Sequence, residues 1–180
     1  TGLWYNSLAS DAGPTEWISA PSERWRSISR DPDGYMYLIG EGAIRFHPDT
    51  LDTQDVGNAI SSQLIAGGLG NWFFNCGAWD TATQTLMVMG SDYYVSRGYL
   101  ARYDPATGIT TLLASDPILT YANGLAVDAG GRPYVPFGNS LWTADLTLPL
   151  PRPDNTGTLI PVAPAFTFGN MLGAPASSSA

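Results

Sequence analysis

Hydrophobic and polar residues alternate along this chain in short runs, and turn-forming residues separate the runs. The clearest example is "YANGLAVDAGGRPYV" at 121–135, in which an Asp-Ala-Gly-Gly turn joins two apolar runs. Alternation with a period of two, bounded by Gly, Pro and Asp, is typical of antiparallel strands joined by tight turns. The pattern predicts a β-hairpin here and an all-β chain with almost no helix.

The hairpin recurs at a regular spacing. Segments 26–40 ("RSISRDPDGYMYLIG") and 75–90 ("NCGAWDTATQTLMVMG") share the pattern of 123–138. Each copy carries an aspartate at its turn, and these aspartates are spaced 49 and 48 residues apart: Asp31, Asp80 and Asp128. Aspartate side chains accept hydrogen bonds from turn N–H groups, so we expect the three carboxylates to stabilise the turns rather than to catalyse a reaction.

A second pair of strands follows the hairpin. Segment 42–56 matches segment 98–113, and each gives a strand, a proline-containing turn and another strand. A third copy at 139–150 keeps the strand but lacks the proline turn. Segment 2–11 resembles one of these later strands, and "GNMLGAP" at 169–175 resembles another first strand.

Four strands in each unit of about 48 residues are typical of a β-propeller. We predict blades of four antiparallel strands, about three of them full, with partial blades at both ends. The domain spans 1–175, and 176–180 form a small polar tail. Four arrangements stay open: part of a larger propeller, a compact four-bladed propeller, a ring completed by two or more chains, and a sandwich or open sheet.

Two stretches resemble known propeller repeats. "YANGLAVDAGGRPYV" (121–135) and "RYDPATG" (102–108) look like blades of NHL-type and SMP-30 (gluconolactonase)-like propellers. In SMP-30-like enzymes an asparagine in an Asn-Gly-Leu context is a divalent-metal ligand near the channel mouth, and Asn123 is the position that matches. The resemblance thus implies a propeller and a Ca²⁺ ligand at Asn123, although calcium sites usually include carboxylates as well.

The positions five residues before the turn aspartates are candidates for a shared site. They are Arg26, Asn75 and Asn123, and a further step of 47 residues adds Asn170. The first strand of a propeller blade lines the central channel, so equivalent positions lie at one height around the axis. We therefore name these four residues as channel-facing candidates for a ligand or metal. The alternative is that the asparagines bond backbone groups at the strand starts.

A second candidate region is "SDYYVSRGY" at 91–99, interpreted as a loop between the second and third strands. Tyrosine, serine and arginine are common in recognition surfaces. The recognition-loop candidates are Tyr93, Tyr94, Arg97 and Tyr99. His47 aligns with Asp104 at an outer turn, so we interpret it as a turn residue rather than a general base.

Composition narrows the function classes. Sixteen acidic residues against eight arginines give a net charge of −8 with no basic stripe, which argues against nucleic-acid binding. One cysteine and one histidine exclude a disulfide scaffold and a zinc site of His and Cys ligands. No apolar run reaches the length of a membrane span.

Catalytic residue types are scarce, and the loops are rich in Tyr, Trp, Ser and Asn. We therefore expect a non-enzymatic binding or assembly module of a secreted or particle-surface protein, with no cofactor. Its partner would be a protein or carbohydrate surface, or a second copy of the chain. The alternative is a Ca²⁺-dependent lactonase-like hydrolase, whose metal would polarise the carbonyl and activate water.

Overall fold

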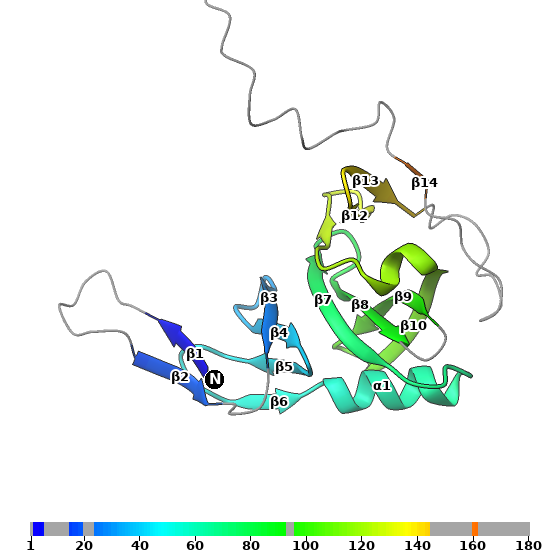
Figure 1. Ribbon diagram of the computed structural model, residues 1–180. Helices are drawn as coiled ribbons and strands as arrows, with labels where there is room; N and C mark the ends of the chain where they lie inside the picture. Colours follow the sequence, from blue (N-terminus) through cyan, green and yellow to red (C-terminus); the bar gives the residue numbers. More distant parts are fainter. Residues whose placement is uncertain (1, 6–14, 20–23, 93–95, 145–159, 162–180) are drawn as a thin grey trace, which may run out of the picture.

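The computed structural model describes residues 2–5, 15–19, 24–92, 96–144 and 160–161. They form three four-stranded antiparallel sheets and one two-stranded sheet (Figure 1). Within each four-stranded sheet the strands lie side by side in chain order. The fold class is therefore the predicted one, an all-β arrangement of propeller-type blades.

The elements have the following bounds. Blade 1 consists of β3 (Trp25–Arg30), β4 (Met36–Gly40), β5 (Ala43–Phe46) and β6 (Thr53–Asp55). Blade 2 consists of β7 (Phe73–Asp80), β8 (Thr85–Asp92), β9 (Arg97–Asp104) and β10 (Ile109–Asp116). Blade 3 consists of β11 (Ala126–Val127), β12 (Pro133–Phe137), β13 (Ser140–Thr143) and β14 (Ile160–Pro161). The two-stranded sheet pairs β1 (Gly2–Tyr5) with β2 (Thr15–Ser19).

The turn aspartates play the structural part that the repeat predicted. Each accepts a backbone N–H from the turn that follows it, at 2.8–2.9 Å: Asp31 from Tyr35, Asp80 from Ala82, and Asp128 from Gly130 and Arg132. In blades 1 and 2 the same carboxylate also pairs with an arginine of the third strand, Arg45 or Arg102, at 3.5 Å. The corresponding position of blade 3 is Thr143, so this ion pair is a feature of the first two blades.

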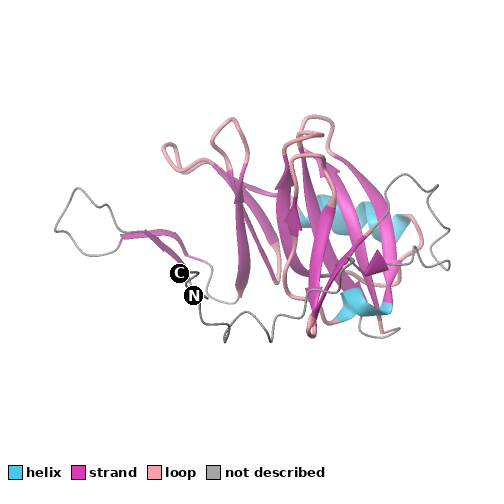
Figure 2. Cartoon of the chain, turned by 90° about the horizontal axis from the view of Figure 1, so that it is seen from above, coloured by secondary structure: helices cyan, strands magenta, loops and turns pink. Residues whose placement is uncertain are grey.

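Consecutive blades pack face to face. We call the face of a blade that meets the next blade along the chain its front face, and we identify it by the residues of the second strand that point to that side. The front face of blade 1, with Tyr37 and Ile39, shares one buried cluster with Leu86 and Val88 of blade 2. The front face of blade 2, with Met87 and Met89, shares a second cluster with Val135 of blade 3. Figure 2 shows the sheets standing side by side, as this packing requires.

Two serine hydroxyls fasten blade 1 to blade 2 at their first strands. Ser27 Oγ accepts the backbone N–H of Gly77, and Ser29 Oγ accepts that of Trp79, both at 2.8 Å. Blade 2 has Cys76 and Ala78 at the corresponding positions, so it offers no such hydroxyls to blade 3.

One α-helix departs from the prediction of almost no helix. Helix α1 (Gly57–Ala66) connects blades 1 and 2, and it buries Ile60 and Leu64, which are spaced four residues apart on one helix face. The glycine-rich stretch "GGLG" at 67–70 follows the end of α1, and the Gly67 N–H donates to the carbonyl of Gln63.

A short 3₁₀ helix, η1 (Pro117–Thr120), leads from blade 2 to blade 3. Asp116 caps it by accepting the Ile118 N–H at 2.9 Å. Within the described residues, no helix has the length and apolar character needed to cross a membrane.

Candidate ligand-binding site at the ends of the first strands

β-bulges mark the starts of the first strands in blades 1 and 2. The pairing register of β3 with β4 shifts between Trp25 and Ser27, and that of β7 with β8 shifts between Phe74 and Cys76. The extra residues are therefore Arg26 and Asn75, two positions that the repeat identified as equivalent. A bulge redirects the side chain of its extra residue, and bulges are common next to binding sites.

Glycines of the second strands, opposite the bulges, make these bulges possible. Gly40 pairs with Trp25, and a Cβ atom at Gly40 would overlap the carbonyl group of Arg24. Gly90 pairs with Phe74, and a Cβ atom there would lie 2.6 Å from the Phe73 carbonyl oxygen and from the Trp72 ring. Both positions require glycine because the bulged strand approaches so closely.

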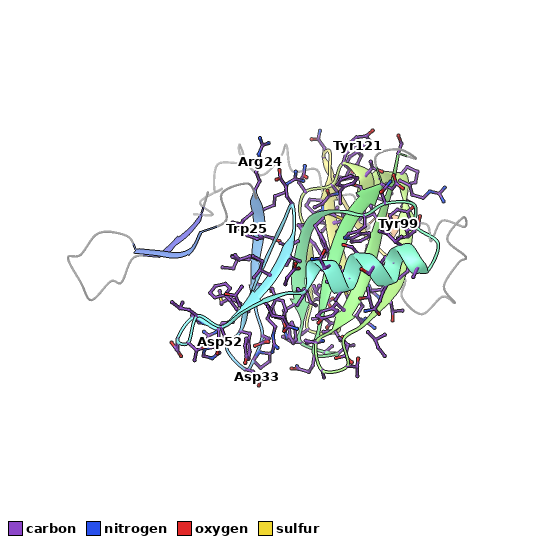
Figure 3. All side chains as sticks on the ribbon, turned by 90° about the horizontal axis from the view of Figure 1, so that it is seen from below. Arg24, Trp25, Asp33, Asp52, Tyr99 and Tyr121 are labelled. Carbon is purple, nitrogen blue, oxygen red and sulfur yellow. The ribbon has the colours of Figure 1, made fainter. Side chains whose placement is uncertain are left out.

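Arg26 opens onto a hollow at this end of the sheets. The hollow has a volume of about 580 Å³, and its described lining is Arg26, Thr120, Tyr121 and Asn123. Arg26 comes from the first strand of blade 1, Thr120 and Tyr121 from the end of η1, and Asn123 from the approach to β11. Figure 3 shows Tyr121 at the same end of the sheets as Arg24, with Asp33 and Asp52 at the opposite end.

The side chains of the hollow have polar groups available for a ligand. Arg26 and Asn123 are exposed, and Tyr121 is 62 % exposed. Thr120 is only 2 % exposed, and its buried hydroxyl has no hydrogen-bond partner in the described part of the chain. The Asn123 side-chain amide donates to the Tyr121 carbonyl at 3.3 Å, which fixes its orientation beside the aromatic ring. A buried hydroxyl without a partner is costly unless something else satisfies it.

Arg26 supplies the positive charge of the hollow. Three other arginines, Arg24, Arg45 and Arg102, each lie within 4 Å of a carboxylate, whereas Arg26 forms no ion pair with any described residue. Its charge also affects the neighbouring thiol. Burial raises the pKa of Cys76 to about 12, and the positive charge of Arg26 opposes that rise. The thiol itself is therefore protonated and inert at neutral pH.

Asn75 lies elsewhere, which corrects the prediction that it faces a channel site. Its side chain is 1 % exposed, its amide donates to the Leu119 carbonyl at 3.4 Å, and its oxygen accepts from the Ser91 hydroxyl at 3.5 Å. The alternative interpretation, an asparagine that bonds a backbone group, describes it better. Because Leu119 belongs to η1, Asn75 holds in place the helix that carries Thr120. Asn170 lies outside the described residues.

The predicted recognition loop is largely strand in the described part. Arg97 begins β9, and Tyr99, two residues further on, is 4 % exposed and lies 6.3 Å from Trp72 between ring centroids. Burial raises the pKa of the Tyr99 hydroxyl. Tyr99 is therefore a core residue and not a recognition residue (Figure 3), while Tyr93 and Tyr94 lie outside the described residues.

His47 has the environment of a turn residue. Its Nδ1 atom accepts the Asp49 N–H at 3.3 Å, just as Asp104 accepts the Ala106 N–H in blade 2. Its ring makes an edge contact with Tyr35 at 5.0 Å. Among the described residues, no nucleophilic side chain forms a hydrogen bond with the His47 ring.

The donor set fits a metal ion poorly. The described lining of the hollow contains no carboxylate. Across the described ranges, no group of three or more His, Cys, Asp or Glu side chains is arranged to hold a metal ion. Of the two described asparagine candidates, Asn123 lines the hollow and Asn75 does not, and Asn123 lies beside Arg26, whose positive charge would repel a metal ion.

Sequence reasoning missed Thr120 and Tyr121. A signal for both was present, because they lie three and two residues before Asn123, the first residue of the Asn-Gly-Leu motif. The 3₁₀ turn that folds them back over the strand ends depends on Pro117 and on the Asp116 cap, which strand periodicity does not reveal.

Comparison with known proteins supports the architecture. No protein-family model and no curated protein sequence matches the chain. Among solved structures, a GH74 xyloglucanase from Xanthomonas campestris is 16 % identical with a TM-score of 0.56, and the match covers 73 % of this chain. The extracellular domain of BT4673 from B. thetaiotaomicron is 23 % identical with a TM-score of 0.58 over 84 % of this chain.

Both of these structures are β-propeller proteins, and at such identities the likeness concerns the fold alone. The match covers 22 % and 20 % of their own chains, so this chain spans about a fifth of their length. The chain is therefore similar to a group of consecutive blades within larger propellers.

Proposed function

We propose that this chain is a non-enzymatic binding module of a secreted or particle-surface protein, and that the hollow at the ends of the first strands is its ligand site. The observation that carries the proposal is the meeting of Arg26, Thr120, Tyr121 and Asn123 in one open hollow, although they come from separate parts of the blade repeat. Its volume of about 580 Å³ lies within the usual range for small-molecule sites.

The residue types favour a carbohydrate ligand. Tyr121 offers an exposed ring for the apolar face of a sugar, and the exposed side chains of Arg26 and Asn123 offer hydrogen bonds to its hydroxyl groups. The described lining lacks a nucleophile paired with a base, which is what a hydrolase would need.

The test is a titration of the chain with galactose and with galacturonic acid, in which binding is measured by saturation-transfer NMR. We expect transfer to at least one of the two sugars, with weaker transfer in the Tyr121→Ala variant. Ile109→Ala is the matched control, because Ile109 is also highly exposed (57 %) but lies in β10. Loss of the signal in both variants, or no signal in either sugar, would refute the site.

The rival hypothesis, a Ca²⁺-dependent lactonase-like hydrolase of the SMP-30 type, predicts a different result. A saturable rise in melting temperature with Ca²⁺, together with ring opening of a sugar lactone that Asn123→Ala abolishes, would replace the binding module with this enzyme. A melting temperature that does not respond to Ca²⁺ would remove the rival.

An assembly role is favoured by a separate observation on blade 3. The front-face residues Ile39 and Met89 of blades 1 and 2 are fully buried by the next blade, whereas Pro136, at the corresponding place in blade 3, is exposed. Nearby Ala126 is also exposed and Leu141 is half-buried. A face with this surface suits another blade, from a second copy of the chain or from a partner protein.

Light scattering over a range of chain concentrations tests the assembly role. We expect self-association that Ala126→Asp weakens and that Ile109→Asp leaves unchanged. A monomer at every concentration would reject assembly between copies of the chain.

A further inference from the structure

The charge of the hollow allows the ligand class to be narrowed, on the basis of the proposed binding function. Arg26 provides the one charged group of the described lining, and it has no carboxylate partner there. In this respect Arg26 differs from Arg24, Arg45 and Arg102, each of which lies beside a carboxylate. A guanidinium in a hollow whose described lining has no acidic group is suited to a ligand that brings its own negative charge.

The remaining groups of the hollow can also donate hydrogen bonds. The Tyr121 side chain, which is 62 % exposed, ends in a phenol hydroxyl, and the exposed Asn123 side chain ends in an amide. Together with the guanidinium they form a site with many donors around an open space, which is what the oxygens of an anion require. We propose that the ligand carries a carboxylate that binds Arg26, and that this carboxylate belongs to an acidic sugar whose ring lies against Tyr121.

The β-bulge explains why arginine serves this purpose at position 26. The bulge inserts Arg26 as an extra residue between Trp25 and Ser27 at the start of β3, where its side chain is exposed, and Gly40 leaves room for the bulged backbone. Asn75, at the equivalent bulge of blade 2, is instead buried against Leu119. The two bulges thus have divided roles: one supports η1, and the other presents a charge.

The experiment compares three probes by calorimetric titration: galacturonic acid, galactose and acetate. We expect galacturonic acid to bind more tightly than galactose or acetate, and its affinity to fall about tenfold or more in Arg26→Gln, as for the loss of one charge-assisted pair. Arg26→Lys keeps the charge but not the two-pronged geometry, so its affinity should be intermediate. Added salt should weaken the binding.

Arg30→Gln is the matched control. Arg30 is also an exposed arginine, and it lies on the same side of β3 as Arg26 but at the other end of the strand. Its removal should leave the affinity unchanged.

The outcomes separate the inference from the function on which it rests. Equal affinity for galactose and galacturonic acid, with no effect of Arg26→Gln, would overturn the carboxylate and leave the sugar site standing. If acetate bound as tightly as galacturonic acid, this would support binding of a carboxylate to Arg26 but would overturn the claim that the carboxylate belongs to a sugar. No binding of any probe would overturn both.

Discussion

Removing the Asp80 carboxylate should cost far more stability than removing the carboxylate of an exposed turn. Asp80 is 0 % exposed, it accepts the Ala82 N–H at 2.9 Å and the Thr83 hydroxyl at 2.5 Å, and it lies 3.5 Å from Arg102. Asp80→Ala would leave the Arg102 guanidinium, which is largely withdrawn from solvent, without its carboxylate. Removing one partner of a buried ion pair costs about 3–5 kcal/mol.

The expected fall in melting temperature follows from the size of the chain. A chain of this length loses roughly 2–4 °C per kcal/mol, so Asp80→Ala should melt about 6–20 °C below the parent protein. The matched variant is Asp104→Ala, because Asp104 also caps a turn, through Ala106 and Thr107, but lies exposed at the outer edge of the same blade. Its melting temperature should fall by much less.

Differential scanning calorimetry of the two variants and the parent chain is the assay. The reasoning would be refuted if Asp80→Ala and Asp104→Ala lowered the melting temperature equally, because burial of the ion pair would then have no energetic consequence. A double variant Asp80→Ala/Arg102→Met should recover part of the loss, since it removes the unpaired charge together with its partner.

Three further predictions concern other parts of the fold. Gly90→Ala should destabilise the chain by about 1–3 kcal/mol in denaturant titration, because the new Cβ atom would meet the Phe73 carbonyl and the Trp72 ring; a variant as stable as the parent would show that the bulge can relax. Cys76, which is 1 % exposed with a pKa raised to about 12, should react with a thiol reagent only after denaturation, and rapid labelling of the native chain would contradict its burial. The pKa of Asp128 is held below its ordinary value of 3.8, chiefly by the hydrogen bond from the Arg132 N–H. The charged carboxylate therefore stabilises the fold above pH 3.8, and this contribution is lost as the pH falls through the lower pKa of the folded state. Asp128→Asn should be less stable than the parent at pH 7, and the difference in stability should disappear in strong acid.

The repeat was readable from sequence because each blade needs the same turn. The aspartates at 31, 80 and 128 each accept a backbone N–H two or four residues further along the turn, so their spacing reports the repeat of the hairpin. The equivalence of Arg26 and Asn75 was also visible, and the matching bulges give it a structural meaning.

The different environments of Arg26 and Asn75 could not be predicted from the repeat. Whether Asn75 faces a channel or a neighbouring carbonyl depends on where η1 lies, and that depends on contacts distant in sequence. Tyr99 looked like a loop residue because "SDYYVSRGY" is rich in polar residues and tyrosine, yet its ring fills the core beside Trp72. Helix α1 escaped notice because Ile60 and Leu64 form an apolar stripe of only two buried residues.

The measurement that most directly tests the central claim is a ¹⁵N-resolved NMR titration of the chain with galacturonic acid. The backbone resonances of Arg26 and of Thr120, Tyr121 and Asn123 should shift together, although Arg26 belongs to blade 1 and the other three belong to the segment between blades 2 and 3. Shifts confined to the opposite end of the sheets, around Asp33 and Asp52, or the absence of any shift, would contradict a ligand site at the ends of the first strands.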